Sequence, residues 1–176
     1  RQMCIRDRED TMTEIDRIVD ELTRVYDGEP WHGSPVRSLL EGVDFAAAAA
    51  RPIAGAHTIW ELVLHLTAWT AEARRRVEGG EPAVPAEGDW PPMPEDLGAS
   101  AWSAALAKLD ASHRDLLRAV RSFPEQRVDE EVGRRRDRAA GTGVSYAVLL
   151  HGVSQHDAYH SGQVAILRKA LGHRFG

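Results

Sequence analysis

The segment from Ser145 to Leu171 repeats apolar residues at helical spacing along its whole length and is followed by Gly172. This pattern predicts one long amphipathic helix with a glycine at its C-terminal end. At about 100° per residue, one line along the helix holds Leu149, Val153, His156, His160, Gln163 and Leu167. Two histidines therefore occupy positions that face the core, where leucines would be expected.

Three other segments have the same periodicity, at about 13–26, 58–77 and 100–123. Thr58 and Glu61 have the spacing of a capping box, which marks the start of the second segment. Leu39, Leu40 and Val43 predict only a short helical turn before Pro52, and five prolines between residues 81 and 98 predict a long loop. No alternating strand pattern competes. We predict an all-α four-helix bundle with crossover connections.

The length of 176 residues is typical of one domain, which we place at residues 12–176. We interpret residues 1–11 as a non-native or disordered N-terminal extension. Cys4, the only cysteine, lies in this extension. Disulfides and a cysteine nucleophile are therefore not expected in the domain.

The charges are mildly acidic, with 22 basic and 27 acidic residues and a net charge of -5. This balance argues against nucleic acid as the main partner. No run of about 20 apolar residues predicts a membrane span, and the N-terminus lacks the apolar region of a secretory signal. We expect a cytoplasmic protein. Arginine outnumbers lysine by twenty to two, which we interpret as the mark of a GC-rich bacterial genome.

The two histidines of the last helix predict a metal site. Burying neighbouring imidazoles without partners costs free energy, and a shared divalent cation satisfies both. His65 is the best third candidate, although its periodicity leaves open whether it faces a pocket or the surface. Three histidines with an open position are typical of catalytic sites, where the metal binds water or a thiolate. We expect one divalent metal per chain, zinc or nickel first, with iron or manganese as alternatives.

Two further residues on this helix are candidate catalytic groups. Asp157 in His156-Asp157-x-x-His160 is similar to the general base of zinc peptidases with H-E-x-x-H, but only His173 follows as a third ligand. A hydrogen bond between helices or to a metal ligand is the alternative for Asp157. Gln163 could orient substrate or metal-bound water, or pack at the pocket wall.

Three of the remaining histidines receive structural interpretations, whereas His32 could close the pocket. His113 is favoured as a hydrogen-bonded core residue over a fourth ligand. His57 is expected to serve the start of its helix, and His151 points away from the metal line.

Two stretches carry a family resemblance. Residues 52–66 (PIAGAHTIWELVLHL) and 151–163 (HGVSQHDAYHSGQ) resemble the second-helix and fourth-helix signatures of the DinB/YfiT-like superfamily. The resemblance implies a four-helix bundle that binds a divalent metal through His65, His156 and His160, and often a homodimer. Characterised relatives include bacillithiol-dependent and mycothiol-dependent thiol transferases and a maleylpyruvate isomerase.

From this resemblance we expect a metal-dependent enzyme that transfers a low-molecular-weight thiol to an electrophile through a metal-bound thiolate. Its partners would then be a small-molecule thiol and an electrophilic substrate. A hydrolase that uses metal-bound hydroxide is the first alternative. A non-catalytic, stress-associated metal-binding protein is the second.

Overall fold

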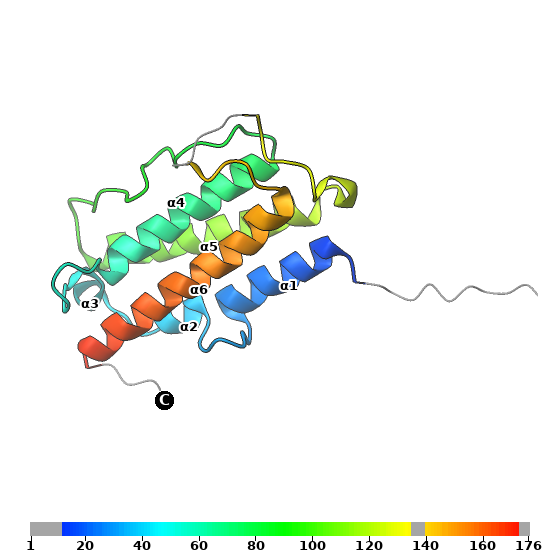
Figure 1. The fold of residues 1–176 in the computed structure, drawn as a ribbon. Helices are drawn as coiled ribbons and strands as arrows, with labels where there is room; N and C mark the ends of the chain where they lie inside the picture. Colours follow the sequence, from blue (N-terminus) through cyan, green and yellow to red (C-terminus); the bar gives the residue numbers. More distant parts are fainter. Residues whose placement is uncertain (1–11, 135–139, 173–176) are drawn as a thin grey trace, which may run out of the picture.

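Within residues 12–134 and 140–172, which the computed structural model describes, the chain is helical and forms no strand. The four long helices lie side by side in a bundle (Figure 1), so the predicted all-α bundle is confirmed. The elements are α1 (Glu14–Asp27), α2 (Val36–Leu40), α3 (Phe45–Ala49), α4 (Ile59–Val77), α5 (Ala99–Arg121), the 3₁₀ turn η1 (Glu125–Arg127) and α6 (Tyr146–Ala170). The interpretation of residues 1–11 as an extension lies outside the described residues.

Side-chain caps fix where α1, α4 and α6 begin. Thr13 and Thr58 each form a reciprocal capping box, Thr58 with the predicted partner Glu61. The Ser145 hydroxyl accepts a hydrogen bond from the Val148 backbone amide at the start of α6. These bonds satisfy amide groups that a helix N-terminus otherwise leaves unpaired.

The order of the helices in space explains the long loop after α4. Figure 1 shows α4 and α5 running in one direction, and α1 and α6 running in the other. Because neighbouring parallel helices need a connection that returns along their length, residues 78–98 cross back over α4. Glu72 and Arg76 hold this crossover through the backbone of Ala83, at 3.0 Å to its amide and 2.8 Å to its carbonyl. The crossover thereby brings Asp89 beside the N-terminal half of α4.

The segment between α1 and α4 contains more helix than we predicted. The expected single turn is two short helices, and α3 was not predicted. The Asp44 carboxylate caps α3 at the Ala47 amide, and Ala48 is fully buried against the core. Five consecutive alanines have high helix propensity but no apolar period, so the pattern search did not detect this helix.

The buried apolar residues form two clusters. One lies around Trp60, Leu62 and Trp102, and the other around Leu22, Leu116 and Leu150. Between them, α4, α5 and α6 contribute a layer of buried polar side chains: Thr67, Thr70, His113, Ser154, Asp157, His160 and Ser161. We call this set the polar layer. His65 is also buried, on the turn of α4 that precedes Thr67 and Thr70, so the candidate ligands lie at the polar middle of the bundle.

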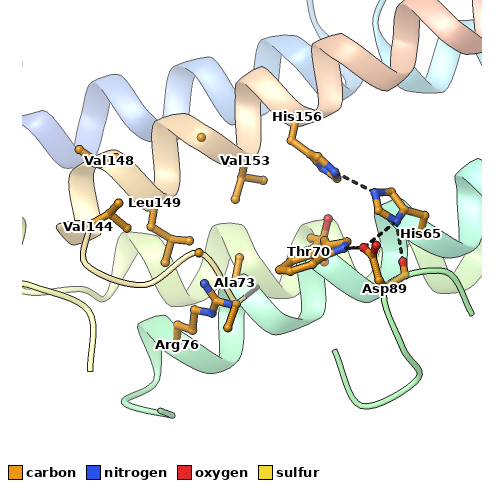
Figure 2. Close-up of a pocket in the computed structure, with 14 residues that line it drawn as sticks. His65, Thr70, Ala73, Arg76, Asp89, Val144, Val148, Leu149, Val153 and His156 are labelled. Atoms are coloured by element: carbon orange, nitrogen blue, oxygen red, sulfur yellow. Dashed lines mark hydrogen bonds and ion pairs between the residues drawn. The ribbon is translucent and has the colours of Figure 1, made fainter. Parts of the chain in front are cut away.

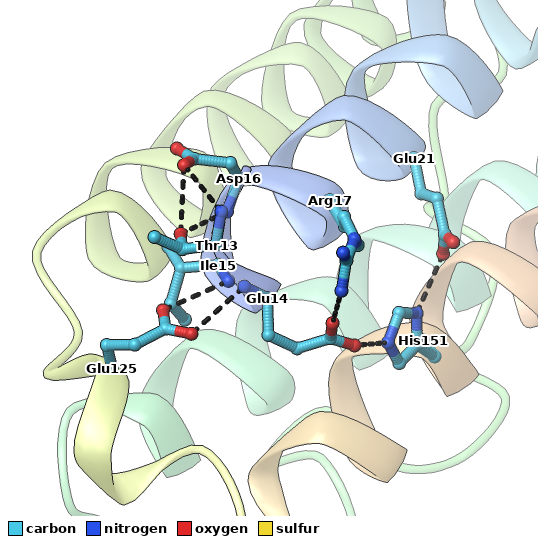
Figure 3. A network of polar contacts seen from close by, with 8 residues as sticks. All are labelled: Thr13, Glu14, Ile15, Asp16, Arg17, Glu21, Glu125 and His151. Carbon is cyan, nitrogen blue, oxygen red and sulfur yellow. Dashed lines mark hydrogen bonds and ion pairs between the residues drawn. The ribbon is translucent and has the colours of Figure 1, made fainter. Parts of the chain in front are cut away.

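A polar network attaches the start of α1 to the rest of the bundle (Figure 3). His151 of α6 binds the carboxylates of Glu14 and Glu21, each at 2.8 Å. The Glu125 carboxylate accepts hydrogen bonds from the backbone amides of Glu14 and Ile15, at 2.9 and 3.2 Å. His151 therefore joins two helices, in agreement with the predicted structural role.

Candidate metal centre

Three histidines from two helices converge at the predicted site. His65 lies on α4, and His156 and His160 lie one turn apart on α6. The Nε2 atom of His156 is 2.9 Å from Nε2 of His65 and 3.1 Å from Nε2 of His160. One ring nitrogen of each residue lies within 4.8 Å of the other two. These three side chains could hold a metal ion.

The outer ring nitrogens of two of these histidines are already hydrogen-bonded. Nδ1 of His65 donates to the Asp89 carbonyl oxygen at 2.6 Å, and Nδ1 of His160 donates to Oε1 of Gln163 at 2.8 Å. Because a neutral imidazole carries one proton, these bonds leave both Nε2 atoms with free lone pairs. Metal-binding histidines are commonly oriented in this way by their second nitrogen.

Burial keeps the cluster neutral. It lowers the pKa of His65 and of His160, and it lowers the pKa of His156 to about 4, with repulsion from the other two imidazoles as a further cause. The carboxylate of Asp89 lies 3.6 Å from Nδ1 of His65 and accepts a hydrogen bond from Trp69 at 2.8 Å. Neutral imidazole is the form that binds a metal.

The donor set fits a first-row divalent ion. Zinc–nitrogen bonds of about 2.0–2.1 Å in a tetrahedral site separate two ligand nitrogens by roughly 3.3 Å. The separations of 2.9 and 3.1 Å are only a few tenths of an ångström shorter. Among the described residues, no cysteine, carboxylate or fourth histidine joins the cluster, so the protein provides three ligands and leaves the other positions open.

An aromatic stack covers one side of His65. The indole of Trp90, on the crossover, lies parallel to the His65 ring with centroids 4.0 Å apart. The ring of His57 stacks on Trp90 at 3.5 Å. Trp90 is 37% exposed, whereas His65 beneath it is 4% exposed, so the stack separates His65 from solvent on that side.

A groove of about 380 Å³ opens from His65 and His156 and continues between α4 and α6. Figure 2 shows His65 and His156 at one end and Arg76 at the other. Its walls are mainly apolar and include Trp69, Ala73, Val144, Val148, Leu149 and Val153. This size and character are typical of small-molecule sites.

The structure brings together only some of the predicted residues. His65, His156, His160 and Gln163 meet at one point. Asp157 lies within the polar layer, and no hydrogen bond or ion pair within the described residues joins it to the three histidines. Its desolvation raises the pKa of the carboxyl to about 7.

The other histidines of the described residues do not join the cluster. His113 is buried and stacks on Tyr26 with centroids 3.9 Å apart, and it is absent from the cluster. The favoured interpretation as a core residue agrees with the structure, but its contact is a ring stack, and no hydrogen bond to the His113 ring is found within the described residues. His57 lies 3.6 Å from Glu61 beside the capping box, but its stacking on Trp90 was not predicted.

Sequence reasoning missed three residues of this region. Asp89 contributes a backbone carbonyl, which no sequence pattern marks. Trp90 is in the proline-rich loop, whose path depends on the crossover. Arg76 is on α4 within a run of three arginines, a composition typical of a solvated helix end, yet its side chain is only 3% exposed.

The geometry agrees with the comparison to known families, in which the model of the DinB superfamily matches residues 31–164. The chain belongs to the DinB superfamily. Membership and the three-histidine cluster together fit a metal-binding protein of this superfamily. No curated protein and no solved structure matches the chain. None of the helices in the described ranges has the length and apolar character needed to span a membrane.

Proposed function

We propose that this DinB-superfamily protein is a divalent-metal-dependent enzyme that transfers a low-molecular-weight thiol to an electrophile. One observation carries the proposal: three neutral imidazoles converge at the end of an apolar groove, and no fourth ligand from the described residues joins them. An incomplete ligand set next to a small-molecule pocket is typical of catalytic sites rather than structural ones.

His65, His156 and His160 would hold the ion. Bound there, a divalent ion would supply a Lewis acid that keeps a thiol deprotonated at neutral pH. Gln163 and the Asp89 carbonyl would orient His160 and His65 through their Nδ1 atoms. The stack of Trp90 on His65 would exclude water from one side of the site, and the groove would receive the organic part of the substrates.

A thiol suits this site better than water does. A free thiol has a pKa of about 8.5, whereas bulk water has a pKa of about 15.7, so a thiol needs much less activation. Asp89 affects the pKa of all three histidines, and its Oδ1 accepts a hydrogen bond from Trp69. A metal-bound thiol depends less than metal-bound water on such a carboxylate as a general base, because its proton is lost more readily.

The test is the metal-dependent conjugation of monochlorobimane with bacillithiol, mycothiol or glutathione, followed by fluorescence. We expect turnover with at least one thiol in zinc-loaded or nickel-loaded protein, and loss of turnover in His160→Ala. His151→Ala is the matched control, because it removes a histidine from the same helix outside the cluster.

Two other results would contradict thiol transfer, and each would indicate a different function. Hydrolysis of esters or amides without any thiol would identify a hydrolase. Stoichiometric metal binding without turnover on either panel would identify a non-catalytic metal-binding protein.

We also propose a cytoplasmic homodimer, and the family resemblance supports the dimer. Sedimentation equilibrium of the purified protein tests the assembly. A mass of one chain at micromolar concentration would contradict the dimer.

A further inference from the structure

The groove has a charged group at its far end. Arg76 is 3% exposed and lines the groove opposite the histidines. Its Nε donates to Glu72 at 2.9 Å, and its Nη2 donates to the Ala83 carbonyl at 2.8 Å. Figure 2 shows this side chain beside Ala73 at the end of the groove.

The charge of Arg76 is only partly compensated. Glu72, its carboxylate partner, also binds Arg75 through two hydrogen bonds, at 2.7 and 2.8 Å. The single carboxylate of Glu72 therefore accepts hydrogen bonds from the guanidinium groups of both Arg75 and Arg76. The nearby Glu81 carboxylate is directed to the backbone amide of Arg134 at 2.9 Å. Within the part of the chain that the structure describes, Nη1 of Arg76 has no acceptor, so an anion in the groove could accept its hydrogen bonds.

The space between the two polar ends is apolar and elongated. His65 and Arg76 are eleven residues apart on α4, which corresponds to about 16 Å along the helix. The glycine at position 152 of α6 leaves the middle of this space open, since an added Cβ would have no neighbour within 4 Å. A ligand that spans the groove must therefore have an apolar body.

We propose that the groove binds an amphiphilic small molecule whose apolar chain lies between α4 and α6 and whose anionic group is bound by Arg76. The other end of this molecule would reach the three histidines. The inference deepens the proposed function, because it specifies the electrophile as an apolar compound with an anionic end. Binding itself does not depend on the metal.

The experiment uses isothermal titration of the full chain after metal removal with a chelator. The probes are decanoate, decanol and decylammonium, which share one apolar chain and differ in charge, each kept below its micelle concentration. We expect one decanoate per chain, bound about tenfold or more tightly than the other two, because a charge-assisted hydrogen bond is involved.

Two pairs of variants locate the ligand. Arg76→Gln should remove the preference for decanoate, and Arg76→Lys should keep part of it. Gly152→Leu should weaken all three probes about tenfold or more by filling the groove. Gly162→Leu is its control, because Gly162 is an exposed position of the same helix with equally open space. Both leucines favour the helix over glycine, and circular dichroism would verify that every variant is folded.

Equal affinities for the three probes, or a decanoate preference that survives Arg76→Gln, would overturn the proposal. So would the absence of saturable binding. Repeating the titration with zinc gives another arm: if the dependence on Arg76 then disappears, the metal holds the anion and the proposed orientation is wrong. Because the first arm contains no metal, its failure leaves the proposed thiol transfer untouched, and failure of thiol transfer leaves this result untouched.

Discussion

α6 carries histidines in two opposite environments. His156 and His160 face α4 in a buried cluster where desolvation and mutual repulsion lower their pKa values. Five residues before His156, His151 lies between two carboxylates of α1 that raise its pKa. The comparison shows that the neighbours of a histidine decide whether its imidazole is neutral, the form that binds a metal, or more readily protonated.

The largest expected effect comes from removing one of the three proposed metal ligands. His160→Ala should lower metal affinity by more than about a hundredfold, because loss of a residue that merely orients a ligand already costs 10–100-fold. Elemental analysis of untagged protein after dialysis measures the bound metal. His151→Ala should retain about one ion per chain, and equal metal loss in both variants would show that the two environments do not differ as described.

A smaller effect is expected from the residue that orients His160. Gln163→Ala removes the acceptor for Nδ1 and should reduce metal affinity about 10–100-fold while the fold is maintained. Competition with a chromogenic chelator gives the affinity. Unchanged affinity would mean that Gln163 only packs at the pocket wall.

Gln163→Glu would give the His160 ring a carboxylate partner, as the His151 ring already has. A carboxylate next to Nδ1 should raise the pKa of His160 in metal-free protein, because it stabilises the imidazolium. Histidine proton NMR across a pH titration reports this change. A pKa that stays in place would indicate that burial, rather than the nearest partner, controls His160.

The smallest effect concerns the contact between α1 and α6. His151 has a folded-state pKa above its ordinary 6.5, so its stabilising contribution is complete below pH 6.5 and is lost as the pH rises through the folded-state value. Glu14 has a pKa below its ordinary 4.5, so its contribution is present above pH 4.5 and is lost as the pH falls through the lowered value. This contact should therefore be most favourable between these two pH ranges.

His151→Gln should flatten the alkaline side of that profile. The change should be no more than about 1 kcal/mol, since the pair is partly exposed and screened. Urea unfolding at several pH values measures it. An unchanged pH profile in the variant would remove His151 as the cause.

The sequence predicted the four long helices because their apolar periods and caps are local properties. Thr58 with Glu61 even identified the start of α4 correctly. It also predicted His156 and His160, since two residues one turn apart on a helix share a face wherever the helix lies. His65 needed the family resemblance, because its position depends on how α4 is rotated against α6.

What could not be predicted depends on the path of the backbone. The Asp89 carbonyl, the stacking of Trp90 and the burial of Arg76 all follow from the crossover along α4. A loop rich in prolines gives no period from which its path could be inferred. α3 was missed for a related reason, because alanines show no difference between a buried and an exposed face.

The polar layer also bears on how the helices align. If α6 slid by one turn, about 5.4 Å, Asp157 and Ser161 could not both stay in the polar layer, because they are four residues apart and one would take the place of the other. The same slide would separate at least one of His156 and His160 from His65, whose Nε2 atom lies 2.9 Å from that of His156. The register of α6 in the bundle is thus the one in which both of its candidate ligands meet His65.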